Sequence, residues 1–271
     1  MSFSDESANA QAPIKRWRWS RQFMGAVTFY TQLPIPHQWP MSFEGFARFA
    51  PLVGIGIGFM LALADWGLVA LALPLATRCA LLVAWWLWLT GGLHLDGAMD
   101  TADGLAVPDP ARRLDVMADS RTGAFGAMVA VVLLGFKTLF LTDLETLRWV
   151  SLPLAAGWGR WAQVVAIACY PYLRPEGKGA LHKAHAQPAT DWLWGFAALL
   201  GLSGIAAAIA PASGLWLMAV TIISGWIALA VGAWLQWQLN GQTGDTYGAI
   251  VEWTEALILC GMVALQGWLA G

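Results

Sequence analysis

Charged residues are scarce in this chain. Only 12% of its 271 residues are Asp, Glu, Lys or Arg, whereas 58% are hydrophobic. Soluble domains carry about 25% charged residues, so the composition argues against a soluble protein and favours a polytopic helical membrane protein. The net charge is −2, so the chain has no overall positive potential that would attract nucleic acid. The chain is rich in tryptophan instead, with 18 residues, which is typical of proteins that meet membrane interfaces.

Cysteine is also sparse and carries no pattern. Cys79, Cys169 and Cys260 are far apart, and each lies in an apolar run. The sequence contains no CxxC or Cys/His spacing, so neither a disulfide scaffold nor a zinc site is indicated. We interpret the three thiols as small buried hydrophobic groups.

The first residues lack the pattern of a cleavable signal peptide. Residues 1–14 are polar, and the basic group that follows precedes only a short, broken apolar segment. We expect residues 1–17 to be a disordered extension. Residues 18–33 are expected to form an amphipathic helix that lies at the membrane interface or re-enters the membrane.

Long apolar runs dominate the remainder. A transmembrane helix needs about 20 predominantly apolar residues, and seven runs reach or approach that length between turns rich in Pro, Gly and Asn. The predicted spans are residues 51–72, 79–93, 123–141, 150–170, 191–210, 215–237 and 251–270. The second predicted span is short, so it either includes residues of the adjoining segments or ends inside the protein. We predict an all-α, polytopic helical membrane protein with about seven transmembrane helices, in which residues 18–271 form a single integral membrane catalytic domain.

The basic residues predict the orientation. With a cytoplasmic N-terminus, eleven of them fall on the cytoplasmic side: Lys15, Arg16, Arg18, Arg21, Arg48, Arg112, Arg113, Arg121, Arg174, Lys178 and Lys183. Only Arg78 and Arg148 fall outside, and Lys137 and Arg160 fall within spans. This bias follows the positive-inside rule. The polar segments 94–122, 171–190 and 238–250 would then share the cytoplasmic side, and the C-terminus would lie on the opposite side.

Three carboxylates at the end of the second span are the main candidates for chemistry. Asp96, Asp100 and Asp103 are spaced i, i+4, i+7, which places them on one face of a helix. Crowded carboxylates repel one another unless a cation compensates. Mg²⁺ prefers oxygen ligands and commonly bridges carboxylates to phosphates, so the spacing predicts a magnesium site. The alternative is a solvated acidic helix end.

Further polar residues in the same segments are candidates for the same site. Asp119 could complete the metal site and Arg121 could hold phosphate, and the alternative is a capped helix start at Asp119 or Ser120 that opens the third span. Lys137 and Arg160 are cations within spans, and Arg174 lies in a basic, glycine-containing loop that suits a large anion. His182 and His185 are interpreted as loop histidines. Gln242, Thr243 and Asp245 lie in a polar, glycine-rich turn that precedes Glu252 and Glu255.

Five motifs, in this order, resemble the cobalamin synthase family, also called adenosylcobinamide-GDP ribazoletransferase. They are Phe29–Pro36, Gly91–Gly104, Asp119–Gly123, Arg174–Gly177 and Gly241–Ala249. The resemblance extends over nearly the whole chain from about residue 20. It implies a Mg²⁺-dependent enzyme of the bacterial inner membrane that acts in cobalamin biosynthesis. Such an enzyme joins adenosylcobinamide-GDP to α-ribazole, or to its 5′-phosphate, and releases GMP.

The resemblance implies roles for the candidate residues in one reaction. Asp96, Asp100, Asp103 and Asp119 are predicted metal ligands, and one of these aspartates or His94 is expected to accept the proton of the ribazole hydroxyl. The predicted substrate-binding residues are Arg121, Arg160, Arg174, Lys137, Gln242, Thr243 and Asp245. The two substrates and the lipid bilayer are the expected partners, together with a second copy of the chain or other cobalamin-assembly enzymes.

Two other functions are less well supported by the sequence. A CDP-alcohol-type phosphotransferase would require Ala-Arg after its Asp-Gly, but here Asp96-Gly97 is followed by Ala98-Met99-Asp100-Thr101. An ion-coupled transporter would place its carboxylates near the middle of the membrane on broken helices. The polar residues here gather at one face instead.

Overall fold

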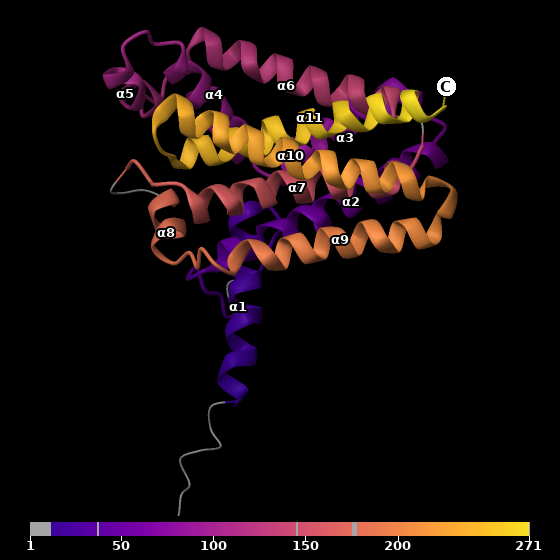
Figure 1. The fold of residues 1–271 in the computed structure, drawn as a ribbon, viewed down its shortest axis with the longest axis horizontal. Helices are drawn as coiled ribbons and strands as arrows, with labels where there is room; N and C mark the ends of the chain where they lie inside the picture. Colours follow the sequence, from indigo (N-terminus) through magenta and orange to yellow (C-terminus); the bar gives the residue numbers. More distant parts are fainter. Residues whose placement is uncertain (1–11, 37, 145, 175–177, 271) are drawn as a thin grey trace, which may run out of the picture.

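The protein is a bundle of helices that run along one long axis (Figure 1). The computed structural model describes residues 12–36, 38–144, 146–174 and 178–270, and the only β-type pairing among these residues is an isolated bridge. The α-helices are α1 (Ala12–Tyr30), α2 (Ala50–Ala70), α3 (Leu75–Leu89), α4 (Leu93–Leu105), α5 (Arg113–Met117), α6 (Ala124–Asp143), α7 (Arg148–Cys169), α8 (Lys178–Ala184), α9 (Asp191–Ile209), α10 (Gly214–Leu239) and α11 (Gly244–Ala270). Short 3-10 helices η1 (Phe46–Phe49), η2 (Pro110–Arg112) and η3 (Pro211–Ser213) lie between them.

Most of the long helices can cross a membrane. Among the described helices, α2 (with η1), α6, α9, α10 and α11 are each long and apolar enough to do so. The pair α3 and α4 meets the same criterion only jointly, which would make a sixth crossing. The protein is therefore an all-α integral membrane protein, as the composition predicts.

Helix α7 explains why fewer helices pass this test than the seven runs predicted from the sequence. Its 22 residues give a length of about 33 Å, enough to span the hydrocarbon core. Residues Val150–Val164 are all buried, because α2, α9, α10 and α11 pack around it. A helix surrounded by protein does not need an apolar surface, so α7 carries Arg160 and Gln163 without exposing them to lipid.

Helices α2 and α7 pack closely through small residues. A Cβ atom on Gly54 would lie 2.3 Å from the carbonyl oxygen of Ala156, and one on Gly58 would lie 2.3 Å from Cα of Pro153. Small residues four apart allow two membrane helices to bring their backbones together. This contact fixes α7 at the centre of the bundle (Figure 1).

The second predicted span ends at a sharp bend. Helices α3 and α4 meet at 89°, and the two residues between Thr90 and Leu93, Gly91 and Gly92, have φ values of 60° and 69°. Only glycine adopts this left-handed backbone without a steric penalty. The N–H of Gly92 also donates to the carbonyl of Leu87 at 3.1 Å, which closes the end of α3. The bend turns α4 across one end of the bundle, so the acidic motif lies there rather than in a continuous span.

The N-terminal helix does not run with the others. Helix α1 is steeply inclined to the bundle axis (Figure 1), and it begins at Ala12, which is earlier than the predicted residue 18. The predicted disorder of residues 1–11 lies outside the described residues. A location of α1 at a membrane interface stays a prediction.

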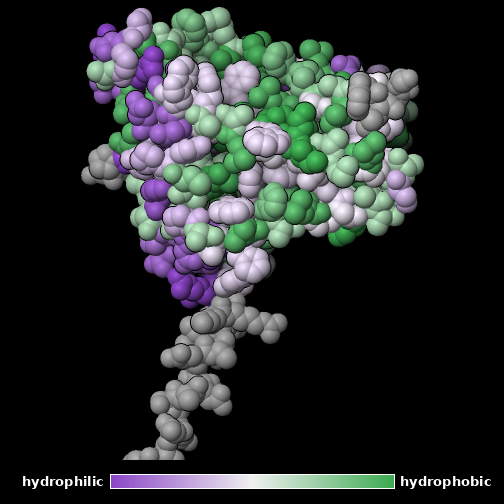
Figure 2. All heavy atoms as spheres, viewed as in Figure 1, coloured by the Kyte–Doolittle hydropathy of each residue, from purple (hydrophilic) through white to green (hydrophobic). Residues whose placement is uncertain are grey.

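The two ends of the bundle differ in polarity. Hydrophilic residues gather at the end that carries α5 and α8 (Figures 1 and 2). The C-terminus lies at the other end (Figure 1). There, Arg78 and Arg148 both pair with Asp65, at 3.4 and 2.7 Å. These two arginines are the ones that the charge pattern assigns to the side opposite the acidic motif.

The bend provides a direct test of the fold. Replacing Gly92 with Ala should lower the free energy of unfolding by about 1–2 kcal/mol, because alanine is strained at positive φ. The added Cβ itself makes only an ordinary contact, 3.8 Å from Leu87 Cδ1. Thermal unfolding in detergent measures the loss. Gly56→Ala in α2, where the new Cβ meets nothing within 4 Å, is the control, and an equal loss in both variants would contradict this account of the bend.

Candidate active site at the polar end of the bundle

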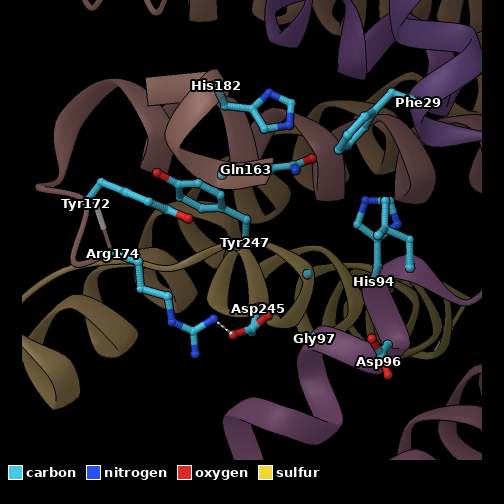
Figure 3. A pocket seen from close by; sticks show the side chains of 14 residues that line it. Phe29, His94, Asp96, Gly97, Gln163, Tyr172, Arg174, His182, Asp245 and Tyr247 are labelled. Carbon is cyan, nitrogen blue, oxygen red and sulfur yellow. Dashed lines mark ion pairs between the residues drawn. The ribbon is translucent and has the colours of Figure 1, made fainter. Parts of the chain in front are cut away.

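A pocket of about 210 Å³ opens at the polar end, between α4, α7, α8 and α11. Its exposed part, which we call the mouth, carries the charged residues Asp96, Arg174 and Asp245 (Figure 3). Its buried part, which we call the inner wall, is made of neutral side chains. The inner wall consists of Phe29, His94, Gln163, His182 and Tyr247. Tyr172 joins the two parts (Figure 3).

The pocket exists because α4 and α11 approach very closely. A Cβ on Gly97 would lie 2.6 Å from the carbonyl oxygen of Asp245, and one on Gly248 would lie 2.7 Å from the carbonyl oxygen of His94. Any larger residue at either position would push the helices apart. The glycines of two separate sequence motifs therefore bring the α4 acids next to the start of α11.

The start of α11 is fixed by local hydrogen bonds. Thr246 Oγ1 accepts from the N–H of Thr243 at 2.7 Å, and Thr243 Oγ1 accepts from the N–H of Thr246 at 3.2 Å. This reciprocal arrangement resembles a capping box and satisfies free N–H groups at a helix start. Thr243 and Gln242 are fully buried and do not line the pocket. Their predicted contact with substrate stays a prediction.

A short backbone pairing brings Arg174 to the mouth. The N–H of Leu173 donates to the carbonyl of Gln242 at 2.8 Å, and the N–H of Gln242 donates to the carbonyl of Pro171 at 2.9 Å. Arg174 then lies 2.8 Å from Asp245 in an ion pair and donates to the carbonyl of Leu114 at 3.3 Å. Residues 175–177 of the same loop motif lie outside the described residues.

The predicted metal ligands do not form a closed site. Asp96, Asp100 and Asp103 all lie on α4, and the contact of Gly97 with the backbone of Asp245 brings Asp245 beside them. Asp103, however, accepts the N–H groups of Gly123 and Gly126 at 2.8 and 2.9 Å and thereby caps α6. Among the described residues, no three His, Cys, Asp or Glu side chains are arranged to hold a metal ion. A metal site on the predicted ligands stays a prediction.

Asp119 and Arg121 pair with each other outside the pocket. Arg121 Nη2 lies 2.7 Å from Asp119 Oδ2, and the Arg121 side chain is 88% exposed. The hydrogen bonds from Arg121 lower the pKa of Asp119 to about 2. Neither residue lines the pocket, so their roles in metal and phosphate binding stay predictions.

Lys137 and Arg160 are buried in an ion network within the bundle. Lys137 Nζ donates to Glu252 and Glu255, both at 2.6 Å, and Arg160 Nη1 donates to Glu255 at 2.7 Å. Lys137 also lies over the ring of Trp86, 4.6 Å from its centroid. Two cations and two acids balance, which is how charges are tolerated inside an apolar bundle. Neither cation lines the pocket, and their predicted substrate contacts stay predictions.

The inner wall contains residues that the sequence did not single out. His182 is 4% exposed, contacts Phe46 with a ring-centroid distance of 4.6 Å, and is held neutral because burial lowers its pKa to about 4. The interpretation of His182 as a loop histidine is wrong, because it lies on α8 and is buried. Nothing in its neighbourhood along the chain marks it. Tyr247 and Phe29 do lie within distinctive motifs, and this is the signal that could have found them. Gln163, in the middle of α7, has no such signal.

The fold and the pocket together define a polytopic membrane protein. Its pocket has charged residues at the mouth and suits an anionic ligand. Comparison with known proteins narrows this class. The family model described as cobalamin-5-phosphate synthase matches residues 22–263. The chain is 50% identical over 242 residues to the adenosylcobinamide-GDP ribazoletransferase of Trichormus variabilis, covering 89% of this chain and 96% of the relative.

Other relatives have the same name and similar coverage. The protein of the same name from Synechococcus elongatus is 54% identical over 234 residues, which cover 86% of this chain and 92% of the relative. That from Leptothrix cholodnii is 37% identical over 266 residues, covering 93% and 96%. No solved structure matches. The chain belongs to the cobalamin-5-phosphate synthase family, as its motifs predict.

The cap on α6 gives a prediction for Asp103. Replacing it with Ala removes two hydrogen bonds to a carboxylate at a helix start, so the free energy of unfolding should fall by about 1–3 kcal/mol. Thermal unfolding in detergent measures the change. Asp109→Ala is the matched control, because Asp109 accepts one N–H, from Ala111, at an exposed turn. A loss for Asp103→Ala no larger than that of the control would contradict the cap.

Proposed function

We propose that this protein is an adenosylcobinamide-GDP ribazoletransferase that acts at the polar end of its helix bundle. The observation that carries the proposal is that Asp96 and the Arg174–Asp245 pair face the same pocket. A carboxylate beside a guanidinium suits the transfer of a phosphoryl-linked group. We infer the substrate, adenosylcobinamide-GDP, from the names of the relatives at 50% and 54% identity.

In the proposed reaction, a hydroxyl oxygen of α-ribazole, or of its 5′-phosphate, attacks the cobinamide-linked phosphorus of the pyrophosphate. A new P–O bond forms, the P–O bond to GMP breaks, and the hydroxyl proton passes to a base. Asp96 is the most accessible candidate base, because it lies at the mouth with its side chain exposed. His94 is 1% exposed, and neither of its ring nitrogens has a hydrogen-bond partner among the described residues, so it remains the second candidate.

Arg174 is placed to bind the pyrophosphate. Its guanidinium has five N–H donors in a planar fork. Contacts with Asp245 and with the carbonyl of Leu114 occupy only part of this capacity. The remaining donors can bind phosphate oxygens at the mouth. Asp245 would hold the guanidinium in place while it does so.

Asp96 at the mouth and Asp100, one turn further along α4, fit Mg²⁺ as the cofactor. Mg²⁺ usually binds through one or two carboxylates, with substrate phosphates and waters completing its shell. Asp96 and Asp100 are the two predicted ligands that are free of a capping or ion-pair contact in the described structure, and they would hold the ion. When bound, the ion would neutralise negative charge that develops on the leaving GMP.

The charge pattern supports a location for the site. We place the protein in the bacterial inner membrane, with the mouth on the cytoplasmic face and the C-terminus on the other side. The support is that Arg78 and Arg148 meet at Asp65, whereas Arg174 lines the pocket at the opposite end, where hydrophilic residues gather (Figure 2).

Activity of the purified protein tests the proposed function. Protein in detergent, given Mg²⁺, adenosylcobinamide-GDP and α-ribazole, should form a corrinoid product and GMP in equal amounts. Asp96→Asn should lower kcat by about 100-fold or more, because it removes both a base and a metal ligand. Asp109→Asn, at an exposed turn away from the pocket, is the control. Absence of product from the wild type would overturn the function, and full activity of Asp96→Asn would remove Asp96 from the site.

Removal of the metal tests the cofactor separately. Treatment with EDTA should reduce GMP release to background, because the carboxylates and the pyrophosphate would then repel each other without compensation. Adding Mg²⁺ back should restore the rate. Unchanged GMP release in EDTA would show that the acids at the mouth work without a divalent ion.

A further inference from the structure

A second cavity, which we call the apolar groove, opens on the side of the bundle between α4, α6, α10 and α11. Its volume is about 420 Å³, and no charged residue lines it in the described part of the chain. Ala230, Trp234 and Leu257 at its edge are exposed. The groove therefore opens on the outer surface of the bundle, which faces lipid in an integral membrane protein.

Helix α4 separates the apolar groove from the candidate active site. The α4 residues that line the groove are spaced i, i+3, i+4 and i+7 from Ala98 to Leu105, which places them on one face. Asp100 lies two residues after Ala98 and therefore points about 160° away from it. Among the described residues, none lines both cavities. The groove is a separate site, outside the proposed reaction.

The position of the groove along the bundle matches one leaflet of a membrane. Along α11 it runs from Ala249 to Leu257, a rise of about 12 Å at 1.5 Å per residue. Gly244, at the polar end, is the first residue of α11, so the groove begins about 8 Å from that end. Half of the hydrocarbon core is about 15 Å thick. The groove therefore has the length for one acyl chain in the leaflet at the polar end.

Arg113 closes the groove at its polar end. Its Nη1 donates to the carbonyl of Gln238 at 2.9 Å, and its Nε donates to the carbonyl of Val107 at 3.3 Å. Gln238 lies one turn beyond Trp234 on α10, and Val107 lies two residues beyond Leu105 on α4. The guanidinium is thus fixed at the point where two walls of the groove end.

Arg113 keeps donors free for an anion. The two carbonyls occupy two of the five N–H groups of its guanidinium. Within the described part of the chain, neither Arg113 nor the exposed Arg112 forms an ion pair, even with Asp109 or Asp115 of the same segment. Figure 1 shows this segment, around α5, at the polar end beside α4. Two unpaired cations at the end of a lipid-facing apolar groove complement a negatively charged lipid headgroup.

We propose that the apolar groove binds one anionic phospholipid. One acyl chain lies in the groove between α10 and α11, and the headgroup phosphate accepts hydrogen bonds from Arg113. Arg112 adds attraction for the net negative charge of the headgroup. This site goes beyond the proposed function and does not depend on it, so a lipid-binding measurement tests it whether or not the protein is active.

Native mass spectrometry of the purified protein in detergent, titrated with a lipid, tests the headgroup site. Wild-type protein should bind phosphatidylglycerol about tenfold more tightly than phosphatidylcholine with the same acyl chains, because only the first headgroup has a net negative charge. Arg113→Gln should weaken the binding of phosphatidylglycerol about tenfold, the loss expected for a charged hydrogen bond.

Arg21→Gln is the matched control for the headgroup. Arg21 is an exposed arginine of α1, which lies away from α5 (Figure 1), so its replacement should leave the affinity unchanged. Equal losses in the two variants would show a general attraction to positive charge and overturn the site. Equal affinity of the wild type for the two lipids would overturn it as well.

A substitution in the groove tests the position of the acyl chain. Ala230→Phe should weaken the binding of phosphatidylglycerol about tenfold, because the ring would displace about two methylene groups of the chain. Ala233→Phe is the matched control, since Ala233 is exposed on the same helix but does not line the groove. Unchanged thermal unfolding shows that both variants are folded. If both variants bind the lipid as the wild type does, no chain occupies the groove and the proposal is wrong.

Other occupants of the groove give different results in the same experiments. A wild-type dimer that Ala230→Phe dissociates would assign the groove to a second copy of the chain. Displacement of the lipid by glycerol phosphate would assign Arg113 to a soluble phosphate ester, and displacement by adenosylcobinamide-GDP would assign the groove to that substrate. Each of these results would overturn the lipid site.

Discussion

The close contact between α4 and α11 is the constraint on which the site depends. Gly97 and Gly248 let the two backbones meet at distances that no side chain would permit. The bend at Gly91 and Gly92 is required as well, because it turns α4 towards this contact. As a result, Asp96 of one motif and Asp245 of another share a pocket, although about 150 residues separate them in the sequence.

Helix α11 is held in this position by charge as well as by packing. Its Glu252 and Glu255 bind Lys137 of α6, and Glu255 also binds Arg160 of α7. Buried ions are stable only when they are paired and hydrogen-bonded. A shift of α11 along its axis would separate them and leave charges unpaired in an apolar bundle. The network therefore fixes the register of α11, and with it the position of Asp245 at the mouth.

The sequence allowed the fold class and the principal acids to be predicted, but not the wall of the pocket. Apolar runs and the i, i+4, i+7 spacing of Asp96, Asp100 and Asp103 are local signals. The partners of Lys137 and Arg160 are not local, so their pairing with Glu252 and Glu255 could not be predicted from the sequence. His182 and Gln163 reach the pocket solely through packing.

The central claim is that phosphoryl transfer takes place in the pocket between α4 and α11. A crystal structure of the protein with Mg²⁺, GMP and α-ribazole bound tests it most directly. The account predicts the GMP phosphate beside Arg174 and the ion on Asp96 and Asp100. Density for these ligands at another place, such as the apolar groove lined by Trp234 and Trp253 between α4, α6, α10 and α11, would contradict it.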